Sequence, residues 1–300
     1  MDEYAVLDCG TNTFHLAIVK LREDQSWETV YKNRKFVYLA EDGIHTIGPK
    51  AYARGMKALD VFSKELRKHR LKGFRAVGTA ALRNAHNADD FIQQANKKFG
   101  INIEIITGVE EAHLIQKGVS HYAPPSEFPF LIMDIGGGSV EFILLEKHQM
   151  LWSKSFEVGV SVLYSKFHNA EPISNSEKVE LNSFLSDHLR ELNLGLISYK
   201  NIGLLGAAGT FDVIENFGGL KIPGTECTQV NLDDFYVISS VIQKMNLNTR
   251  LDTPEIPSYR AEMIVVALLL IEYVLKSGDI SNICIVMGDI KDGILLDLIN

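Results

Sequence analysis

The chain has 300 residues, 46% hydrophobic and 23% charged, with a formal net charge of −8. This length is sufficient for two domains, and the negative charge argues against a nucleic-acid partner, because a phosphate backbone requires a basic surface. No apolar run reaches the roughly 18 residues of a membrane span, and the N-terminus lacks the basic start of a secretory signal. We therefore expect a cytoplasmic protein that does not enter a membrane.

The first part of the sequence alternates between strand and helix patterns. Runs of β-branched and aromatic residues predict strands over 4–8, 13–20, 28–39, 74–79 and 102–107. Apolar residues at helical spacing predict helices over 50–72, 88–99 and 109–122. Three prolines within residues 123–129 interrupt these patterns, so we place a domain boundary there, between 1–122 and 123–300.

The same order of elements begins again after the prolines. Strands are expected over 130–134, 140–146, 150–157 and 282–288, and "IGLLGAAG" at 202–209 is expected as a strand that enters a glycine turn, with helices between the later strands and at the C-terminus. The segment "LDCGTNTFHLAIV" aligns with "MDIGGGSVEFILL", matching Asp8 to Asp134 and Thr13 to Ser139. An internal repeat of this kind predicts two similar α/β domains that face each other across a cleft. Whether the last helix, about 289–300, packs back on the first domain is left open.

Each copy of the repeat is a strand that ends in an aspartate, followed by a glycine turn and a strand that begins with a hydroxyl residue. Such a turn can direct backbone N–H groups at an anion, and the aspartate can hold a divalent cation that bridges to phosphate oxygens. A third glycine turn, "GAAGT" at 206–210, follows a strand and opens a helix, which is a common anion site. Ordinary hairpin and strand-to-helix turns remain the alternative.

Three charged features accompany these turns. Arg83 follows a strand, where its planar guanidinium could clamp a phosphate, although a solvated surface arginine is the alternative. Glu110 and Glu111 occupy the first turn of a helix, a position that the helix dipole favours for acids whatever their function. The basic run 64–72 is interpreted as the solvated end of a helix, with a track for a long polyanion as the alternative.

Four motifs in this order, "LDCGTNTFHLAIV", "GTAALRNAHNADDF", "IEIITGVEEAHLIQKGV" and "LIMDIGGGSVEF", with "GAAGT" downstream, resemble the exopolyphosphatase and guanosine pentaphosphate phosphatase family. This family is a branch of the actin-like, sugar-kinase-like and chaperone-ATPase-like superfamily. The resemblance is close over the first half of the chain and looser over the rest. It implies two ribonuclease H-like domains of the actin-like ATPase fold, with an interdomain cleft.

The resemblance also implies an activity and a site. The activity is exopolyphosphatase, the Mg²⁺-assisted hydrolysis of the terminal phosphoanhydride bond of inorganic polyphosphate, which releases orthophosphate. Glu111 would be the base that activates water, and Arg83 would clamp the phosphate. Metal-associated carboxylates would be Asp134, Glu141 and Asp8. The implied phosphate-binding residues are Gly10, Thr11, Asn12, Thr13, Gly136, Gly137, Gly138, Ser139, Gly209 and Thr210.

Two departures from the family pattern lie near the C-terminus. Lys291 and Asp292 stand where the family more usually has an arginine before a glycine, and "YRAEMIVVALLL" lacks the glycine expected after its arginine and acid. Three other functions stay open: a guanosine pentaphosphate phosphohydrolase, a non-catalytic sensor of guanosine tetraphosphate or ATP, and a sugar kinase, since the fold is shared. A homodimer is also left open.

Overall fold

The computed structural model of the chain describes residues 2–124, 128–147, 149–207 and 209–299. The chain forms two compact units, and each has a sheet and a hydrophobic core of its own. The first unit comprises Met1–Gly118, Gly136–Gly138 and Ile290–Asn300, and the second comprises Val119–Ile135 and Ser139–Asp289. The first unit is thus assembled from three separate segments of the chain.

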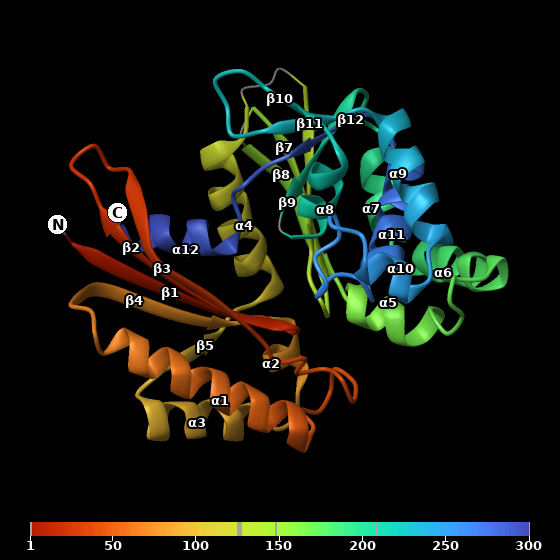
Figure 1. Cartoon of the computed structure of the whole chain (residues 1–300). Helices are drawn as coiled ribbons and strands as arrows, with labels where there is room; N and C mark the ends of the chain where they lie inside the picture. The colour runs from red at the N-terminus through yellow and green to blue at the C-terminus, as the bar shows by residue number, and fades with distance from the viewer. Residues whose placement is uncertain (1, 125–127, 148, 208, 300) are drawn as a thin grey trace. The chain divides into compact units, whose positions relative to one another are not determined.

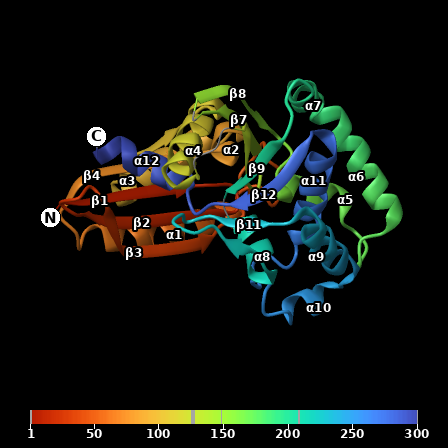
Figure 2. The ribbon, with the colours of Figure 1, turned by 90° about the horizontal axis from the view of Figure 1, so that it is seen from above.

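The first unit contains a 5-stranded sheet in the order β3-β2-β1-β4-β5. The first four of these strands can be followed in Figure 2. Its strands are β1 (Glu3–Cys9), β2 (Thr13–Leu21), β3 (Trp27–Phe36), β4 (Leu71–Gly78) and β5 (Ile103–Ile105). The pairs β1–β2 and β2–β3 are antiparallel, whereas β1–β4 and β4–β5 are parallel. The ends of β1, β4 and β5 therefore lie at one edge of the sheet, where the chain enters the predicted site segments.

Helices cover both faces of this sheet (Figure 1). They are α1 (Pro49–Leu66), α2 (Ala80–Asn84), α3 (Ala88–Phe99), the first part of α4 (Gly108–Tyr122) and α12 (Ile290–Ile299). The helices α1 and α3 bury Leu59, Phe62 and Phe91 against the sheet. On the other face α12 packs against β1 and β4. A Cβ at Gly293 would overlap the carbonyl of Leu114, so α12 and α4 approach as closely as backbones can.

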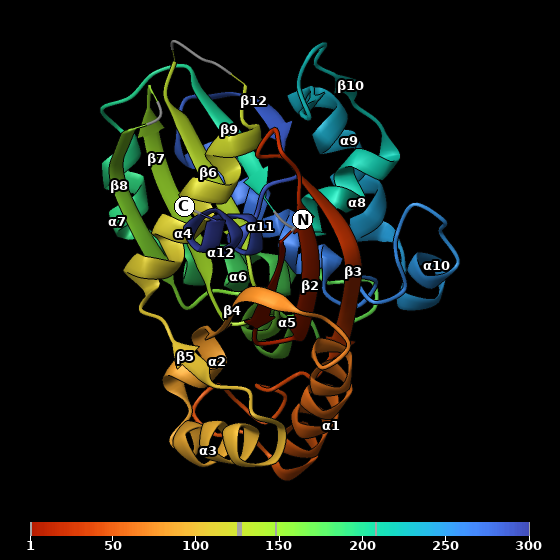
Figure 3. The ribbon, with the colours of Figure 1, turned by 90° about the vertical axis from the view of Figure 1, so that its left-hand side faces the viewer.

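The second unit contains a 7-stranded sheet in the order β10-β11-β12-β9-β6-β7-β8 (Figure 3). Its strands are β6 (Phe130–Ile135), β7 (Val140–Glu146), β8 (Gln149–Phe156), β9 (Ile202–Ala207), β10 (Leu220–Lys221), β11 (Thr228–Val230) and β12 (Ile280–Ile285). Here β6, β7, β8, β9 and β12 repeat the order and the directions of the five strands of the first unit. The internal repeat and the α/β fold class predicted from the sequence are confirmed.

The helices of the second unit enclose a larger core. They are α5 (Val160–Phe167), α6 (Asn175–His188), α7 (Arg190–Leu196), α8 (Gly209–Phe217), α9 (Leu232–Lys244), α10 (Leu247–Leu251) and α11 (Ile264–Ser277). Buried on nearly every side, α11 packs against α5, α6 and α9. It has 14 residues, and no helix in the described part of the chain has the length and apolar character of a membrane span.

Several predicted elements were too long. The strands expected over 102–107 and 282–288 end at Ile105 and Ile285. The helix expected over 50–72 ends at Leu66, and β4 begins at Leu71, because Gly73 and the alternation after it favour a strand. The strand expected over 28–39 ends at Phe36, since the backbone of residues 37–39 bonds to a turn instead of to the sheet. Of the proline-rich segment predicted to separate the domains, residues 125–127 lie outside the described residues, and the two units divide after Gly118.

Three of the five lysine and arginine side chains in the basic run 64–72 have carboxylate partners. Lys64, Lys68 and Lys72 bind the carboxylates of Asp60, Glu65 and Asp2 at 2.6, 2.7 and 2.7 Å. Cations that already have carboxylate partners are poorly suited to follow a long polyanion, because binding would have to displace those partners. Arg67 and Arg70 make no ion pair in the described part of the chain, so the solvated surface and the polyanion track both stay predictions.

Candidate functional site

The adjacent glutamates at the start of α4 occupy different environments. Glu111 is 6% exposed, and its Oε2 accepts a hydrogen bond from Nη1 of Arg83 at 2.9 Å. Glu110 lies at the surface and accepts from Nη2 of Arg75 at 2.6 Å. Successive residues of a helix point about 100° apart, so one carboxylate faces inward and the other outward. The fold thus singles out Glu111 of the pair.

Arg83 links the carboxylate of Glu111 to the edge of the first unit's sheet. It lies on α2, directly after β4, and its Nη1 also donates to the carbonyl of Ile106 at 3.1 Å, just beyond β5. Its side chain is 23% exposed, which excludes a freely solvated arginine. Because β4 and β5 run parallel, their carboxyl ends bring Arg83 and the start of α4 together. The arginine therefore holds Glu111 in a defined position.

The first glycine turn, Gly10–Thr13, joins β1 to β2 in the same unit. The N–H of Gly10 donates to the carbonyl of Thr13 at 3.0 Å, which closes the turn. The carbonyl of Asn12 accepts from the N–H groups of Val37 and Tyr38 at 2.8 and 3.1 Å. Residues 37–39, predicted as strand, thus brace the turn from outside.

The second glycine turn, Gly136–Gly138, groups with the first unit although its flanking strands belong to the second. A Cβ added at Gly137 would lie 2.6 Å from the side chain of Asn12, and one at Gly138 would lie 2.9 Å from Oγ1 of Thr11. Real Cβ atoms essentially never approach so closely. The two repeated turns therefore lie against each other, and glycine is required in the second by the protein's own packing.

The carboxylates of the second unit form a row across its sheet. Asp134 on β6 lies directly opposite Glu141 on β7, which lies opposite Ser155 on β8. Oε1 of Glu141 accepts from the hydroxyls of Ser139 and Ser155, each at 2.6 Å. Asp134 is 9% exposed and Glu141 2%. Directly opposite side chains have Cβ atoms about 4.5–5.5 Å apart, so two like charges are held close together in a largely buried place.

The neighbouring carboxyl groups of Asp134 and Glu141 have the oxygen donors that a divalent cation needs. A Mg²⁺ ion favours oxygen ligands and is commonly held by one or two carboxylates together with substrate oxygens and water. No group of three or more His, Cys, Asp or Glu side chains that could hold a metal occurs among residues 2–124, 128–147, 149–207 and 209–299. Asp8, the third predicted metal residue, lies on β1 of the first unit, opposite His15.

Arg260 lies against the third glycine turn, and the sequence analysis did not predict it as a site residue. Ala208, in the middle of the predicted turn, lies outside the described residues, whereas Gly209 and the buried Thr210 begin α8. The guanidinium of Arg260 lies against Gly209 so closely that a Cβ there would overlap Nη2. The only sequence signal for this residue is its place in "YRAE", where the family resemblance had already noted a departure.

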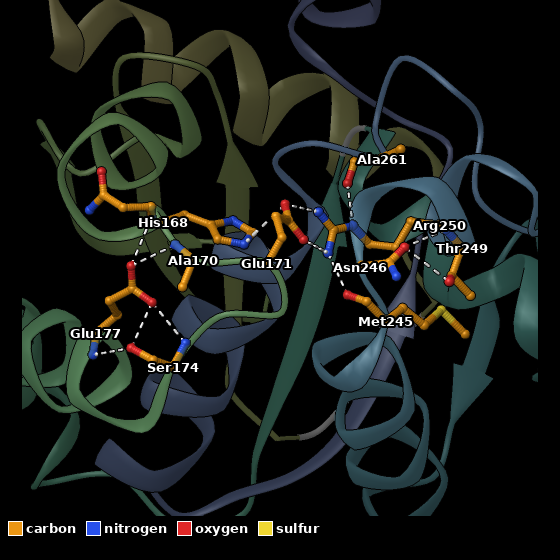
Figure 4. A network of polar contacts seen from close by, with 11 residues as sticks. His168, Ala170, Glu171, Ser174, Glu177, Met245, Asn246, Thr249, Arg250 and Ala261 are labelled. Atoms are coloured by element: carbon orange, nitrogen blue, oxygen red, sulfur yellow. Dashed lines mark hydrogen bonds and ion pairs between the residues drawn. The ribbon is translucent and has the colours of Figure 1, made fainter.

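A buried ion pair fixes the segment that carries Arg260 (Figure 4). Arg250 is fully buried and donates from Nη1 and Nη2 to the carboxylate of Glu171 at 3.0 and 2.6 Å. It also donates to the carbonyls of Ala261 and Met245 at 2.6 and 2.8 Å. Because Ala261 follows Arg260 directly, these bonds restrict where the Arg260 backbone can go.

Two known proteins are similar to this chain, one in sequence and one in both sequence and structure. A guanosine-5′-triphosphate,3′-diphosphate pyrophosphatase from Vibrio vulnificus is 33% identical over 71% of this chain, which spans 43% of that protein's length. The crystal structure of an exopolyphosphatase from Cytophaga hutchinsonii matches with a TM-score of 0.92 and 31% identity, covering 99% of this chain and 97% of that one.

A more distant match shows the same fold. An Aquifex aeolicus member of the Ppx/GppA protein family has the same fold, with a TM-score of 0.81 and 18% identity over 99% of this chain and 97% of that one. The sequence pattern of the Ppx/GppA phosphatase family matches residues 18–300, nearly the whole chain. This chain belongs to the Ppx/GppA phosphatase family.

Proposed function

We propose that the chain is an exopolyphosphatase, which removes the terminal phosphate of inorganic polyphosphate as orthophosphate. The observation that carries this proposal is the buried Glu111 held by Arg83, at the edge of the sheet where the two glycine turns lie. A relative of nearly equal length with 31% identity, from Cytophaga hutchinsonii, is named an exopolyphosphatase. Phosphoryl transfer depends mainly on positioning and charge stabilisation, and this arrangement supplies both.

The proposed reaction assigns one task to each group. The oxygen of a water molecule bonds to the terminal phosphorus, and the carboxylate of Glu111 accepts a proton from that water. The bond from that phosphorus to the bridging oxygen breaks, and the shortened polyphosphate leaves with the bond's electron pair. The guanidinium of Arg83 stabilises the negative charge on the transferring group and keeps Glu111 in place.

Asp134 and Glu141 would hold Mg²⁺ in this proposal. Their cross-strand pairing places two oxygen donors together, and the hydroxyls of Ser139 and Ser155 orient Glu141. A bound Mg²⁺ would neutralise charge on phosphate oxygens. Along the chain Asp134 precedes the glycine turn by only two residues, so the metal ligand and the turn are coupled through the backbone.

Guanosine pentaphosphate is the second candidate substrate. It offers the same kind of bond, and the Vibrio vulnificus relative carries the name of that activity. A direct comparison of orthophosphate release from polyphosphate and from guanosine pentaphosphate decides between them. Release from the nucleotide alone would replace the first substrate with the second, and binding without release from either would indicate a sensor.

Adjacent glutamates offer a matched test of the mechanism. We expect Glu111→Gln to lower turnover by about 10²- to 10⁴-fold, because the amide keeps the size of the side chain but cannot accept the proton. Glu110→Gln changes an exposed ion pair and should alter turnover by less than about twofold. Orthophosphate release is measured for both variants at equal folded concentration. Full activity of Glu111→Gln would exclude this carboxylate as the base.

A further inference from the structure

A pocket of about 470 Å³ lies in the second unit, away from its glycine turn. It opens where β6, β9 and β12 begin, and it is lined there by Phe130, Gly203 and Asn282. The six residues of β9 separate it from Gly209 by roughly 20 Å, at about 3.3 Å per residue. Its volume falls within the roughly 300–1,000 Å³ of ligand sites. This pocket is therefore a separate feature from the predicted phosphate-binding turn at α8.

Aromatic rings form two parts of the pocket lining. Phe130 and Gly203 are register partners on parallel strands, and a Cβ at Gly203 would lie 2.5 Å from the Phe130 ring. The absence of a side chain at Gly203 lets that ring lie over the strand. Phe128, also in the lining, is 58% exposed. Such rings are suited to stack against a planar ligand.

Amide side chains supply the polar part of the lining. Asn201 immediately precedes β9, and Gln229 lies on β11, opposite Cys284. Across the described part of the chain neither side-chain amide makes a hydrogen bond to the protein. A side-chain amide has both hydrogen-bond donors and an acceptor. It can therefore form two hydrogen bonds with the edge of a nucleobase.

The pocket lining carries no charged side chain within the part of the molecule that the structure describes. Burial raises the pKa of the Cys284 thiol to about 11, so this group too is uncharged at neutral pH. A phosphate placed here would lose water without meeting a cation, which is costly. The lining therefore favours a neutral ligand, in contrast to the polyanion of the proposed reaction.

We propose that this pocket binds an uncharged nucleobase or nucleoside, stacked on Phe128 and Phe130 and hydrogen-bonded at its edge by Asn201 and Gln229. The inference goes beyond the proposed phosphatase activity and does not depend on it. Binding is measured without turnover, so failure of one proposal leaves the other intact.

Titration calorimetry with adenosine and guanosine tests this site on the full chain. We expect saturable binding to the native protein, and at least tenfold weaker binding to Asn201→Ala/Gln229→Ala and to Phe128→Ala. These side chains lie at the surface, but Asn201 has a left-handed backbone with a φ of 52°, which alanine tolerates less well than asparagine does. Circular dichroism and urea unfolding therefore verify that the variants keep their fold. Gln93→Ala, which removes an exposed amide from α3 in the first unit, should bind as the native protein does.

Three outcomes would overturn the proposal. The first is no binding of either nucleoside at millimolar concentration. The second is equal binding by the native chain and by the Asn201→Ala/Gln229→Ala variant. The third is binding that inorganic phosphate displaces and that Glu111→Gln weakens, because the nucleoside would then occupy the candidate phosphatase site.

Discussion

Arg83 and Arg75 make similar ion pairs with neighbouring glutamates, but the Glu111 side chain is 8% exposed and that of Glu110 is 40% exposed. Arg75 binds Glu104 at 3.0 Å and Glu110 at 2.6 Å, both on the exposed side of the first unit. Arg83 instead joins a buried carboxylate to the carbonyl of Ile106. The pair proposed for catalysis, Arg83 and Glu111, can therefore be compared with a pair of the same chemistry whose glutamate is exposed.

Arg83→Lys tests whether the planar guanidinium itself is needed. Lysine keeps the charge, but as a single compact donor it cannot reproduce the fork that reaches Glu111 and Ile106. We expect turnover to fall by about 10²-fold, because small displacements of a catalytic group cost this much. Arg75→Lys should change turnover little, because the glutamates that Arg75 binds are 50% and 40% exposed, and pairs with exposed partners contribute weakly. Equal losses in the two variants, measured by orthophosphate release, would assign Arg83 only a structural role.

The contact between the two glycine turns predicts a steric effect at the element scale. A methyl group at Gly137 must displace the Asn12 side chain, while the Asn12 carbonyl stays bonded to Val37 and Tyr38. We expect Gly137→Ala to destabilise the chain by about 1–3 kcal/mol in urea unfolding. Adding Asn12→Ala should recover part of that loss, because it removes the atoms in conflict.

A helix glycine with open space around it serves as the control for that variant. No atom lies within 4 Å of a Cβ built at Gly195 on α7. Gly195→Ala should therefore stabilise the chain by about 0.5–1 kcal/mol, the usual gain within a helix. If Gly137→Ala unfolded at the same urea concentration as the native chain, the packing of one turn against the other would be too loose to require glycine.

The capping box of α6 predicts how stability depends on acid (Figure 4). Burial alone would raise the pKa of Glu177, but hydrogen bonds from Ser174, Asn169 and Ala170 lower it to about 2. The unfolded chain binds this proton at a higher pH, near 4.5, so acid favours unfolding. The contribution of Glu177 is therefore complete above pH 4.5 and is lost as the pH falls to about 2.

Glu177→Gln should unfold more easily than the native chain at pH 7, and the difference should shrink between pH 4.5 and about 2. Burial lowers the pKa of His168, which also weakens the fold on acidification, but this effect begins nearer neutral pH and is common to both proteins. Urea unfolding over this pH range gives the measurement. Glu180→Gln, at an exposed position of the same helix, is the control, and a difference that stays constant with pH would contradict the assignment.

Local patterns explain why the repeated strands and glycine turns could be predicted from sequence. The end of β3 before Val37 could not be predicted in this way. It depends on a hydrogen bond from the N–H of Val37 to the carbonyl of Asn12, which is distant along the chain. Arg260 was missed for the same reason, since its contact with Gly209 joins segments some fifty residues apart. The different roles of Glu110 and Glu111 follow from which side of α4 faces the sheet, and the family resemblance, not the local pattern, selected the second.

At the scale of the whole molecule, one topology is used twice with different additions. The second unit extends the five-strand order with β10 and β11, and it has the larger buried core. The first unit closes its sheet with α12, which comes from the far end of the chain. Mg²⁺, a cytoplasmic location and a homodimer stay predictions from the sequence.

The assignment of α12 to the first unit gives a testable prediction. We expect α12 to unfold with the unit on which it packs, and not with the unit that precedes it along the chain. Leu59→Ala and Leu268→Ala each empty a fully buried position, in the cores of the first and second units, and should each cost about 2–5 kcal/mol. Hydrogen exchange should then lose protection in β1, β2 and α12 for Leu59→Ala, and in β6 and β9 for Leu268→Ala. Although α12 directly follows β12 along the chain, it packs on β1 and β4, so its amides should respond to the first substitution. Loss of α12 protection in Leu268→Ala alone would show that it unfolds with the second unit, and equal losses everywhere would show that the chain unfolds as one body.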